Sequence, residues 1–219
     1  MNASTLQPEL ARHIIQRVGE SGQPPEQGIT HLNVGNDSYL RILETEYLAR
    51  LKHNPRGSSF KLVQGYYGGG KTHFLYCVRD LAWKHGFLTS LVNLSPRECP
   101  YDDAVKVYGS VAVNLASPPP EEGLEPTRGL TDILRDLADD KVTAMGEERA
   151  LTWIWRTAAR VPAESHSFRK AAAAFMAAYL QGDDLREAAL EPWLLGEPVP
   201  QSETRSIGVF EAIETATGF

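Results

Sequence analysis

Hydrophobic residues in the first 54 positions recur every three or four residues, which is the spacing of amphipathic helices. A first helix is predicted over 6–18, behind Pro8, a residue suited to a first turn. A second helix is predicted to begin at Asp37 or Ser38 and to end before Asn54-Pro55. With a short strand expected at 29–34, this part of the chain is predicted to be mostly helical.

The pattern changes at position 58. Residues 58–64 (SSFKLVQ) form a compact run typical of a strand, 65–70 (GYYGGG) a glycine-rich turn, and 71–84 have helical spacing. A second run at 87–94 (FLTSLVNL) is rich in Leu, Val and Phe, as strands buried in parallel sheets are. Together these segments predict one βαβ unit.

From residue 95 onward the pattern predicts helices separated by Gly and Pro. The predicted helices cover 102–115, 130–137, 147–160, 166–180, 185–194 and 202–217. The alanine-rich stretch 171–178 is interpreted as a close-packing helix face. The expected division is an N-terminal helical segment (1–57), a βαβ unit (58–115) and a helical insert or lid (116–219).

Residues 65–72 (GYYGGGKT) fit G-x-x-x-x-G-K-[ST], the phosphate-binding loop, in full and between a predicted strand and helix. Glycines let backbone N–H groups approach phosphates, and the helix N-terminus adds partial positive charge. Lys71, the candidate catalytic residue, would bridge β- and γ-phosphate oxygens, and the Thr72 hydroxyl would ligate Mg²⁺. The candidate nucleotide-binding residues are Gly65, Gly68, Gly69, Gly70, Lys71, Thr72 and His73. The alternative is a glycine-rich turn that precedes Lys-Thr by chance, and the flanking elements favour the phosphate loop.

A hydrolytic P-loop enzyme also needs a second strand that ends in an acidic residue and holds Mg²⁺. The sequence contains no run of four hydrophobic residues followed by Asp, and the run at 87–94 continues into Ser95-Pro96. It also offers two good strands and a weaker third one at 29–34, where a doubly wound sheet usually has about five. We therefore expect the chain to stop before its sheet is complete.

Several segments resemble the ATP-binding proteins of bacterial BREX phage-defence systems, which are P-loop ATPases of the AAA+ and origin-recognition type. The segments are ARHIIQRVGESGQPPEQG, LNVGNDSYLRILETEYLARL, GSSFKLVQGYYGGGKTHFLYCVRDLAWKHGF and NLSP. The similarity is specific over 11–114. In that family an acidic magnesium-binding strand and a C-terminal part follow the helical insert, so the chain resembles the N-terminal half.

This resemblance implies an α/β fold of the P-loop NTPase (AAA+-like) class, a partial parallel sheet with a large helical insert. It implies ATP and Mg²⁺ as cofactors, and other defence-system subunits or self-association as partners. DNA contact is expected only through partners or a missing C-terminal part. By resemblance to related ATPases, the turn of Pro24-Pro25 and Gly28 is expected to approach the adenine.

The composition excludes a disordered protein, and the sequence contains neither a recognisable membrane-spanning segment nor a secretory signal. Hydrophobic residues make up 42% and charged residues 23%, which excludes disorder as the main state. The longest apolar run, 171–180, is half of the roughly 20 residues that a membrane-spanning helix needs. No secretory signal is recognisable, and the two cysteines encode neither a disulfide framework nor a zinc site. A cytoplasmic protein without membrane contact is expected.

The net charge of −6 is unevenly distributed. Residues 1–94 contain 10 basic and 7 acidic side chains, and residues 95–219 contain 12 and 21. Nucleic-acid-binding domains usually gather Lys and Arg at high pI, and the pI here is about 5.5. The overall charge therefore argues against DNA binding by this segment alone.

Other residues near the loop have two interpretations each. Tyr66 and Tyr67 either stack on a partner or shape the loop, and shaping is favoured. His73 and Cys77 have the i, i+4 spacing of a metal chelate. Because no further ligand is recognisable, burial against the sheet is favoured.

The helical half offers further candidates. Trp153 and Trp155 cannot share one helix face, so one is expected in a core and the other on a partner surface. Arg156 and Arg160 have two interpretations, arginine fingers that act in trans or ion pairs with Glu147, Glu148 and Glu164, and the ion pairs are favoured. The acidic group of Asp132, Asp136, Asp139 and Asp140 is interpreted as a solvated face rather than a metal site.

Two functions remain from different classes. The first is an ATPase, or the ATP-binding half of one, that acts as a motor or switch in phage defence. The second is a non-hydrolysing, nucleotide-dependent module that docks on other defence subunits. A small-molecule kinase is disfavoured because no Asp/Arg phosphoacceptor site is recognisable.

Overall fold

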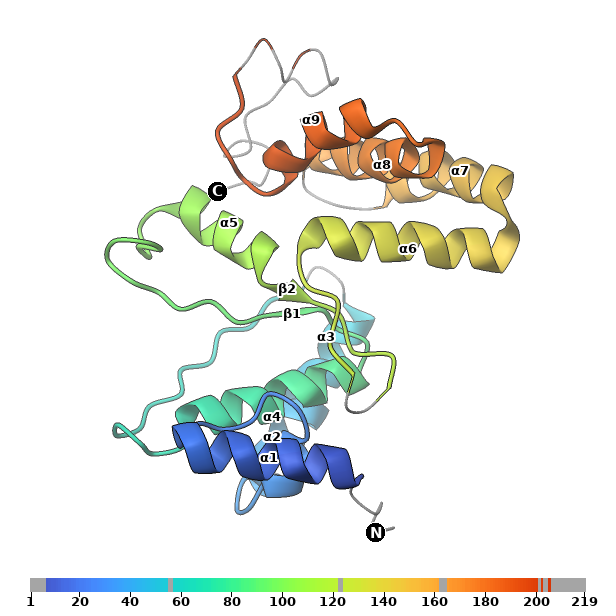
Figure 1. Ribbon diagram of the computed structural model, residues 1–219. Coiled ribbons are helices and arrows are strands. Elements are labelled where there is room, and N and C mark those ends of the chain that lie inside the picture. The colour runs from blue at the N-terminus through green and yellow to red at the C-terminus, as the bar shows by residue number, and fades with distance from the viewer. Residues whose placement is uncertain are drawn as a thin grey trace. The chain divides into compact units, whose positions relative to one another are not determined.

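The computed structural model describes residues 7–54, 57–121, 124–161 and 165–200, together with Ser202 and Arg205. The chain divides into two compact units. Unit 1 comprises Met1–Thr89 and Ser117–Pro126, and unit 2 comprises Ser90–Ala116 and Thr127–Phe219. Both units are mainly helical (Figure 1).

Helices within the first 84 residues make up most of unit 1. Helix α1 (Pro8–Ser21) has its proline in the first turn and buries Leu10 and Ile14, as its spacing predicts. The short strand expected at 29–34 is instead the 3-10 turn η1 (Ile29–Leu32). The second predicted helix is confirmed and runs through α2 (Asp37–Ile42), the π-helical stretch η2 (Leu43–Leu48) and α3 (Ala49–His53). Helix α4 (Lys71–Lys84) has the predicted bounds.

Polar contacts connect α4 with the rest of unit 1. His85, just after α4, contacts the Glu44 carboxylate, with 2.9 Å between Nε2 and Oε1. The Arg79 guanidinium donates to the Glu26 carbonyl and to Asp80 Oδ1, and it lies over the rings of Tyr76 and Trp83. These contacts orient α4, and therefore the loop that precedes it.

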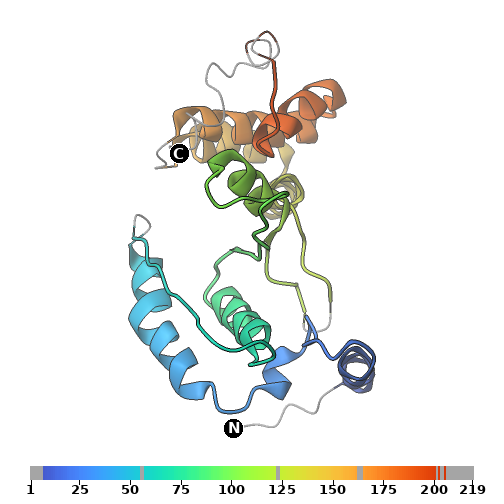
Figure 2. The same cartoon turned by 90° about the vertical axis from the view of Figure 1, so that its left-hand side faces the viewer.

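The predicted α/β fold class is wrong. Within the described residues the only sheet is the pair of two-residue strands β1 (Thr89–Ser90) and β2 (Leu115–Ala116), so neither a parallel P-loop sheet nor a βαβ unit forms there. Residues 58–64 are an elongated connection (Figure 2), whose backbone makes no hydrogen bond to the backbone of another described residue. A strand exists only with a hydrogen-bonded neighbour, and the pattern in 58–64 and 87–94 does not specify that neighbour.

Unit 2 is a helical assembly. It contains α5 (Ala104–Val113), α6 (Leu130–Met145), α7 (Glu147–Arg156), η3 (Ala158–Arg160), α8 (His166–Gln181) and α9 (Asp184–Leu194). The helices predicted at 166–180 and 185–194 are confirmed within one residue. Helix α6 extends eight residues beyond the predicted end, and the helix predicted over 147–160 is interrupted at Thr157. The helix predicted at 202–217 lies outside the described residues, apart from Ser202 and Arg205.

Helix α8 forms the centre of the core of unit 2. One buried cluster joins Phe175 of α8 to Leu190, Trp193 and Leu194 of α9. A second joins Met176 of α8 to Ala138 of α6 and Ile154 of α7. The alanines at 171, 173, 174, 177 and 178 are all buried, which confirms the close-packing interpretation. None of the described helices is long and apolar enough to cross a membrane.

Candidate phosphate-binding site

The glycine-rich loop is a tight turn that leads directly into α4. Gly68 and Gly70 have φ values of 74° and 79°, a left-handed conformation that L side chains rarely adopt. The Gly69 N–H donates to the Tyr66 carbonyl at 3.1 Å, and a Cβ on Gly69 would lie 3.0 Å from that oxygen. The observed turn therefore favours glycine at positions 68 and 70 through their φ values, and at position 69 a Cβ would crowd the Tyr66 oxygen.

The first turn of α4 presents backbone donors. Gly70 is the N-cap and has no side chain with which to cap the helix. The Phe74 N–H donates to the Gly70 carbonyl at 2.9 Å, so the N–H groups of Lys71, Thr72 and His73 precede the first helical hydrogen bond. No acidic side chain lies in this turn. A helix start of this kind favours an anion through its free donors and its dipole.

The Lys71 side chain folds back over the loop. Its ammonium Nζ donates to the carbonyl oxygens of Gly65 at 3.0 Å and of Tyr66 at 2.6 Å. These contacts place the positive charge above the same turn that presents the backbone donors. The loop thus brings together a cation and several N–H groups without an intervening carboxylate.

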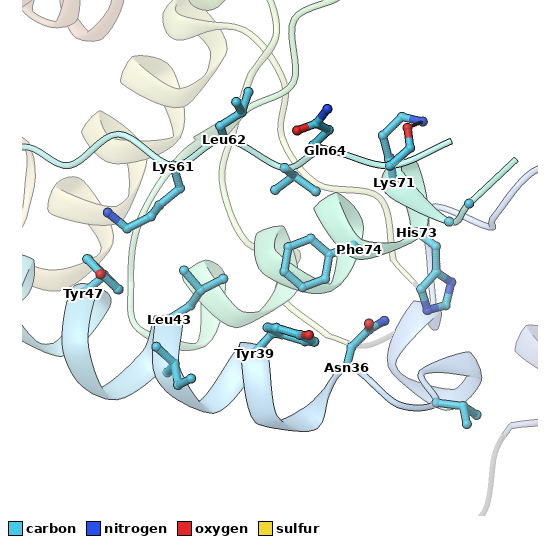
Figure 3. A pocket seen from close by; sticks show the side chains of 16 residues that line it. Asn36, Tyr39, Leu43, Tyr47, Lys61, Leu62, Gln64, Lys71, His73 and Phe74 are labelled. Atoms are coloured by element: carbon cyan, nitrogen blue, oxygen red, sulfur yellow. Dashed lines mark hydrogen bonds between the residues drawn. The ribbon is translucent and has the colours of Figure 1, made fainter. Parts of the chain in front are cut away.

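A cavity of about 750 Å³ adjoins the loop within unit 1. Apolar side chains form most of its wall: Val34, Tyr39, Ile42, Leu43, Tyr47, Leu62, Val63 and Phe74. The loop contributes Gly65, Gly69, Gly70 and Lys71, and the other polar lining residues are Asn36, Lys61, Gln64 and His73. Tyr39 and Phe74 lie side by side, with Lys71 and His73 at one end and Lys61 and Tyr47 at the other (Figure 3). None of these lining residues carries a carboxylate.

A family model described as BREX system ATP-binding protein BrxC/D matches residues 6–218. The chain belongs to the BrxC/BrxD family. Comparisons with curated proteins and with solved structures give no match. Family membership confirms the resemblance found in the sequence, and it gives the chain the family's described property, ATP binding, within a BREX defence system.

The structure places the predicted site residues of this BrxC/BrxD family member in one continuous turn. Gly65 to Gly70 form the loop, Lys71 to His73 begin α4, and Thr72 is exposed there. His73 lines the cavity. Cys77, one turn further along α4, is buried, with its Sγ 3.7 Å from Asn33 Oδ1, and burial raises the pKa of its thiol. Its burial is therefore confirmed, although it is covered by Asn33 and not by a sheet.

Two expectations concern neighbours of the loop. The Tyr66 and Tyr67 side chains are 92% and 104% exposed, so their rings pack on nothing that would shape the loop. In the turn expected near the adenine, Pro25 is fully buried and Gly28 faces Leu10 and Ile14 of α1. Neither Pro25 nor Gly28 lines the cavity beside the loop.

Sequence reasoning missed the cavity wall. Tyr39 and Phe74 belong to helices that were predicted correctly, but they are 35 positions apart in the sequence. Helical spacing shows that an aromatic residue lies on an apolar face, and it does not distinguish a cavity wall from a filled core. No local pattern marks these residues as part of a site.

The acidic residues of α6 contact donors of unit 2. Asp132 pairs with Arg135, Asp136 accepts from the Thr127 hydroxyl, and Asp139 accepts from the Tyr179 hydroxyl. Arg135 also donates to Glu187 of α9 at 2.7 Å. All four aspartates are exposed, which confirms the interpretation as a solvated face, and three of them also take part in hydrogen bonds within unit 2.

Proposed function

We propose that the chain binds ATP through its glycine-rich loop, as the Walker A part of a BREX ATPase. The observation that carries the proposal is the turn itself, in which glycine-dependent geometry, free N–H groups at the start of α4 and the Lys71 ammonium converge. In this proposal the amides of Gly68 to His73 surround the phosphates. Lys71 moves from the carbonyls of Gly65 and Tyr66 onto phosphate oxygens.

The residues present fit the chemistry of both proposed cofactors. ATP supplies a phosphoanhydride whose negative charge matches the donors of the loop, and a hydroxyl oxygen is a ligand that Mg²⁺ accepts. Thr72 is exposed in the first turn of α4, beside Lys71. The nucleoside fits the adjoining cavity, whose aromatic wall at Tyr39 and Phe74 offers faces on which a base can stack.

A second function, a nucleotide-dependent docking module without hydrolysis, is supported by a separate observation. No carboxylate lines the cavity or occupies the first turn of α4, so the described site lacks a group that would complete Mg²⁺ binding or activate water. The exposed rings of Tyr66 and Tyr67 at the loop offer a contact for another BREX subunit or a second copy of the chain.

Calorimetric titration with ATP and Mg²⁺ tests the proposal. Lys71→Ala removes a charge-assisted hydrogen bond worth about 1.5–3 kcal/mol, so the Kd for ATP should rise about 10- to 150-fold. Lys84→Ala removes the same charge from the last turn of α4 and should leave the affinity unchanged. Equal ATP affinity in wild type and Lys71→Ala would contradict the assignment of the loop. Phosphate release measured on the same samples distinguishes the ATPase from the docking module.

A further inference from the structure

Positive charge is concentrated in one stretch of an acidic region. Residues 149–170 contain five basic side chains and one acidic side chain, whereas the rest of 95–219 contains seven basic and twenty acidic ones. The five are Arg149, Arg156, Arg160, Arg169 and Lys170. The overall charge of the chain, which argues against nucleic-acid binding, conceals this local reversal of sign.

Three of these five cations are exposed on helix α7 and on η3, which follows it. Helix α7 buries Ala150 and Ile154 against the core of unit 2. Arg149 and Arg156 are seven residues apart, so they lie on one side of the helix, about 10 Å apart along its axis. Both are exposed, as is Arg160 in η3.

Trp155 also lies on the solvent-exposed half of α7, about 100° around the helix axis from Arg156. It is 45% exposed, whereas Trp153 packs against the second core cluster, with the Lys141 ammonium 4.7 Å from its ring. The expectation that one tryptophan enters a core is therefore confirmed, and the contact of the other with a partner stays a prediction. Its partly exposed indole is accessible to a planar ligand.

The arginines of this surface are not neutralised within the described part of the chain. Arg149, Arg156 and Arg160 make no ion pair or hydrogen bond there. The pairs expected with Glu147 and Glu148 do not form, and Glu164, the third expected partner, lies outside the described residues. By contrast, Arg135 pairs with Asp132 and Glu187. The free guanidinium groups are available to an external anion.

We propose that Arg149, Trp155, Arg156 and Arg160, the α7 surface, bind single-stranded nucleic acid. A base stacks on the Trp155 indole while the guanidinium groups bind the flanking phosphates, to which their planar donors are matched. An acidic peptide would satisfy the arginines but would supply no planar group for the indole. A nucleotide chain supplies both phosphates and planar bases at short intervals. The proposal does not depend on the loop of unit 1.

The expected binding is weak and sensitive to salt. Contacts with a few phosphates give non-specific dissociation constants of about 10⁻⁴ to 10⁻⁶ M at physiological salt, and the net charge of −6 opposes association. For single strands, log K falls with log salt by about 0.7 per phosphate neutralised. Each arginine removed should therefore reduce this slope by a similar amount.

Fluorescence anisotropy of a labelled oligothymidylate, titrated with the full chain at low salt, tests the proposal. Trp155→Ala should raise the Kd about 5- to 150-fold, the equivalent of about 1–3 kcal/mol per stacked base, and Trp155→Phe should restore part of the affinity. Arg156→Ala should weaken binding and reduce the salt slope. Arg186→Ala, which removes an exposed cation from α9, is the matched control and should have little effect. Circular dichroism verifies that each variant is folded.

Three results would overturn the proposal. One is the absence of binding by the folded wild type at low salt. Another is an equal loss in Arg156→Ala and Arg186→Ala, because diffuse electrostatics would then be sufficient. The third is competition by polyglutamate as effective as that by unlabelled oligonucleotide, which would assign the surface to an acidic protein partner. Loss of affinity in Trp155→Ala with partial recovery in Trp155→Phe supports stacking on the indole.

Discussion

Two glycines at opposite ends of α4 allow the role of the loop to be separated from its effect on stability. Gly70 precedes the helix with a φ of 79°, and Gly86 follows it with a φ of 78°. A Cβ at either position would meet no atom within 4 Å. Alanine at each site therefore introduces the same backbone strain and no steric clash.

The size of the effect follows from the conformation. An L-residue in the left-handed region costs about 1–2 kcal/mol relative to its preferred conformations. In Gly86→Ala this strain should appear as a loss of stability, with ATP affinity unchanged. In Gly70→Ala the exposed loop relaxes, and ATP must restore the bound geometry. The same 1–2 kcal/mol then raises the Kd for ATP about 5- to 30-fold.

Isothermal titration with ATP, combined with thermal unfolding followed by circular dichroism, measures both quantities for the two variants. The reasoning holds if Gly70→Ala binds ATP more weakly than Gly86→Ala while both fold. If both variants bind ATP as tightly as the wild type, the left-handed turn at Gly70 has no part in binding. If Gly86→Ala loses as much affinity as Gly70→Ala, the effect comes from α4 as a whole and the loop is not responsible.

Three other predictions concern catalysis, packing and pH. The 219-residue chain alone should release phosphate from ATP far more slowly than the ~1 s⁻¹ of a working enzyme, because no carboxylate lines the cavity beside the loop. Phosphate release near that rate that is abolished by Lys71→Ala would contradict this prediction. Phe175→Ala leaves a cavity in the first core cluster of unit 2 and should lower the free energy of unfolding, measured in urea, by about 3–5 kcal/mol. Leu185→Ala, at an exposed position of α9, should change the free energy of unfolding by less than about 0.5 kcal/mol. The Lys106 backbone N–H donates to the Asp103 carboxylate at the start of α5 and holds the pKa of Asp103 below its usual value of 3.8. The stabilisation from this hydrogen bond is fully present above the usual pKa of Asp103 and is lost as the pH falls through the lowered pKa. The difference in Tm between wild type and Asp103→Asn should therefore decrease in acid. A difference in Tm that stays constant with pH would contradict this prediction.

Local features of the fold were predictable because neighbouring residues determine them. The bounds of α4 follow from a glycine turn at one end and His85-Gly86 at the other. The bounds of α8 follow from the Ser165 cap, which accepts from the Phe168 N–H, and from Gly182. The separation of Trp153 from Trp155 follows from helix geometry alone. In each case the sequence signal and the structural cause lie within one or two turns.

The features that sequence reasoning missed depend on distant residues. Whether 58–64 becomes a strand depends on a hydrogen-bonding neighbour, and the pattern of its own side chains does not provide one. The cavity beside the loop is lined by residues from separate helices, among them Tyr39 and Phe74. Likewise, Arg79 reaches the Glu26 carbonyl from 53 positions away. None of these arrangements has a local signature.

The discontinuity of unit 1 limits how the protein can be divided genetically. The chain leaves this unit at Thr89 and returns to it for residues 117–126 before the rest of unit 2 follows. A truncation after Thr89 would remove Glu125, whose Oε1 accepts from Gln27 at 2.6 Å. A fragment that starts at Thr127 would lack α5 and β2, whose residues contribute to unit 2. No single cut therefore yields either unit intact, and internal deletions or circular permutation are the ways to study each alone.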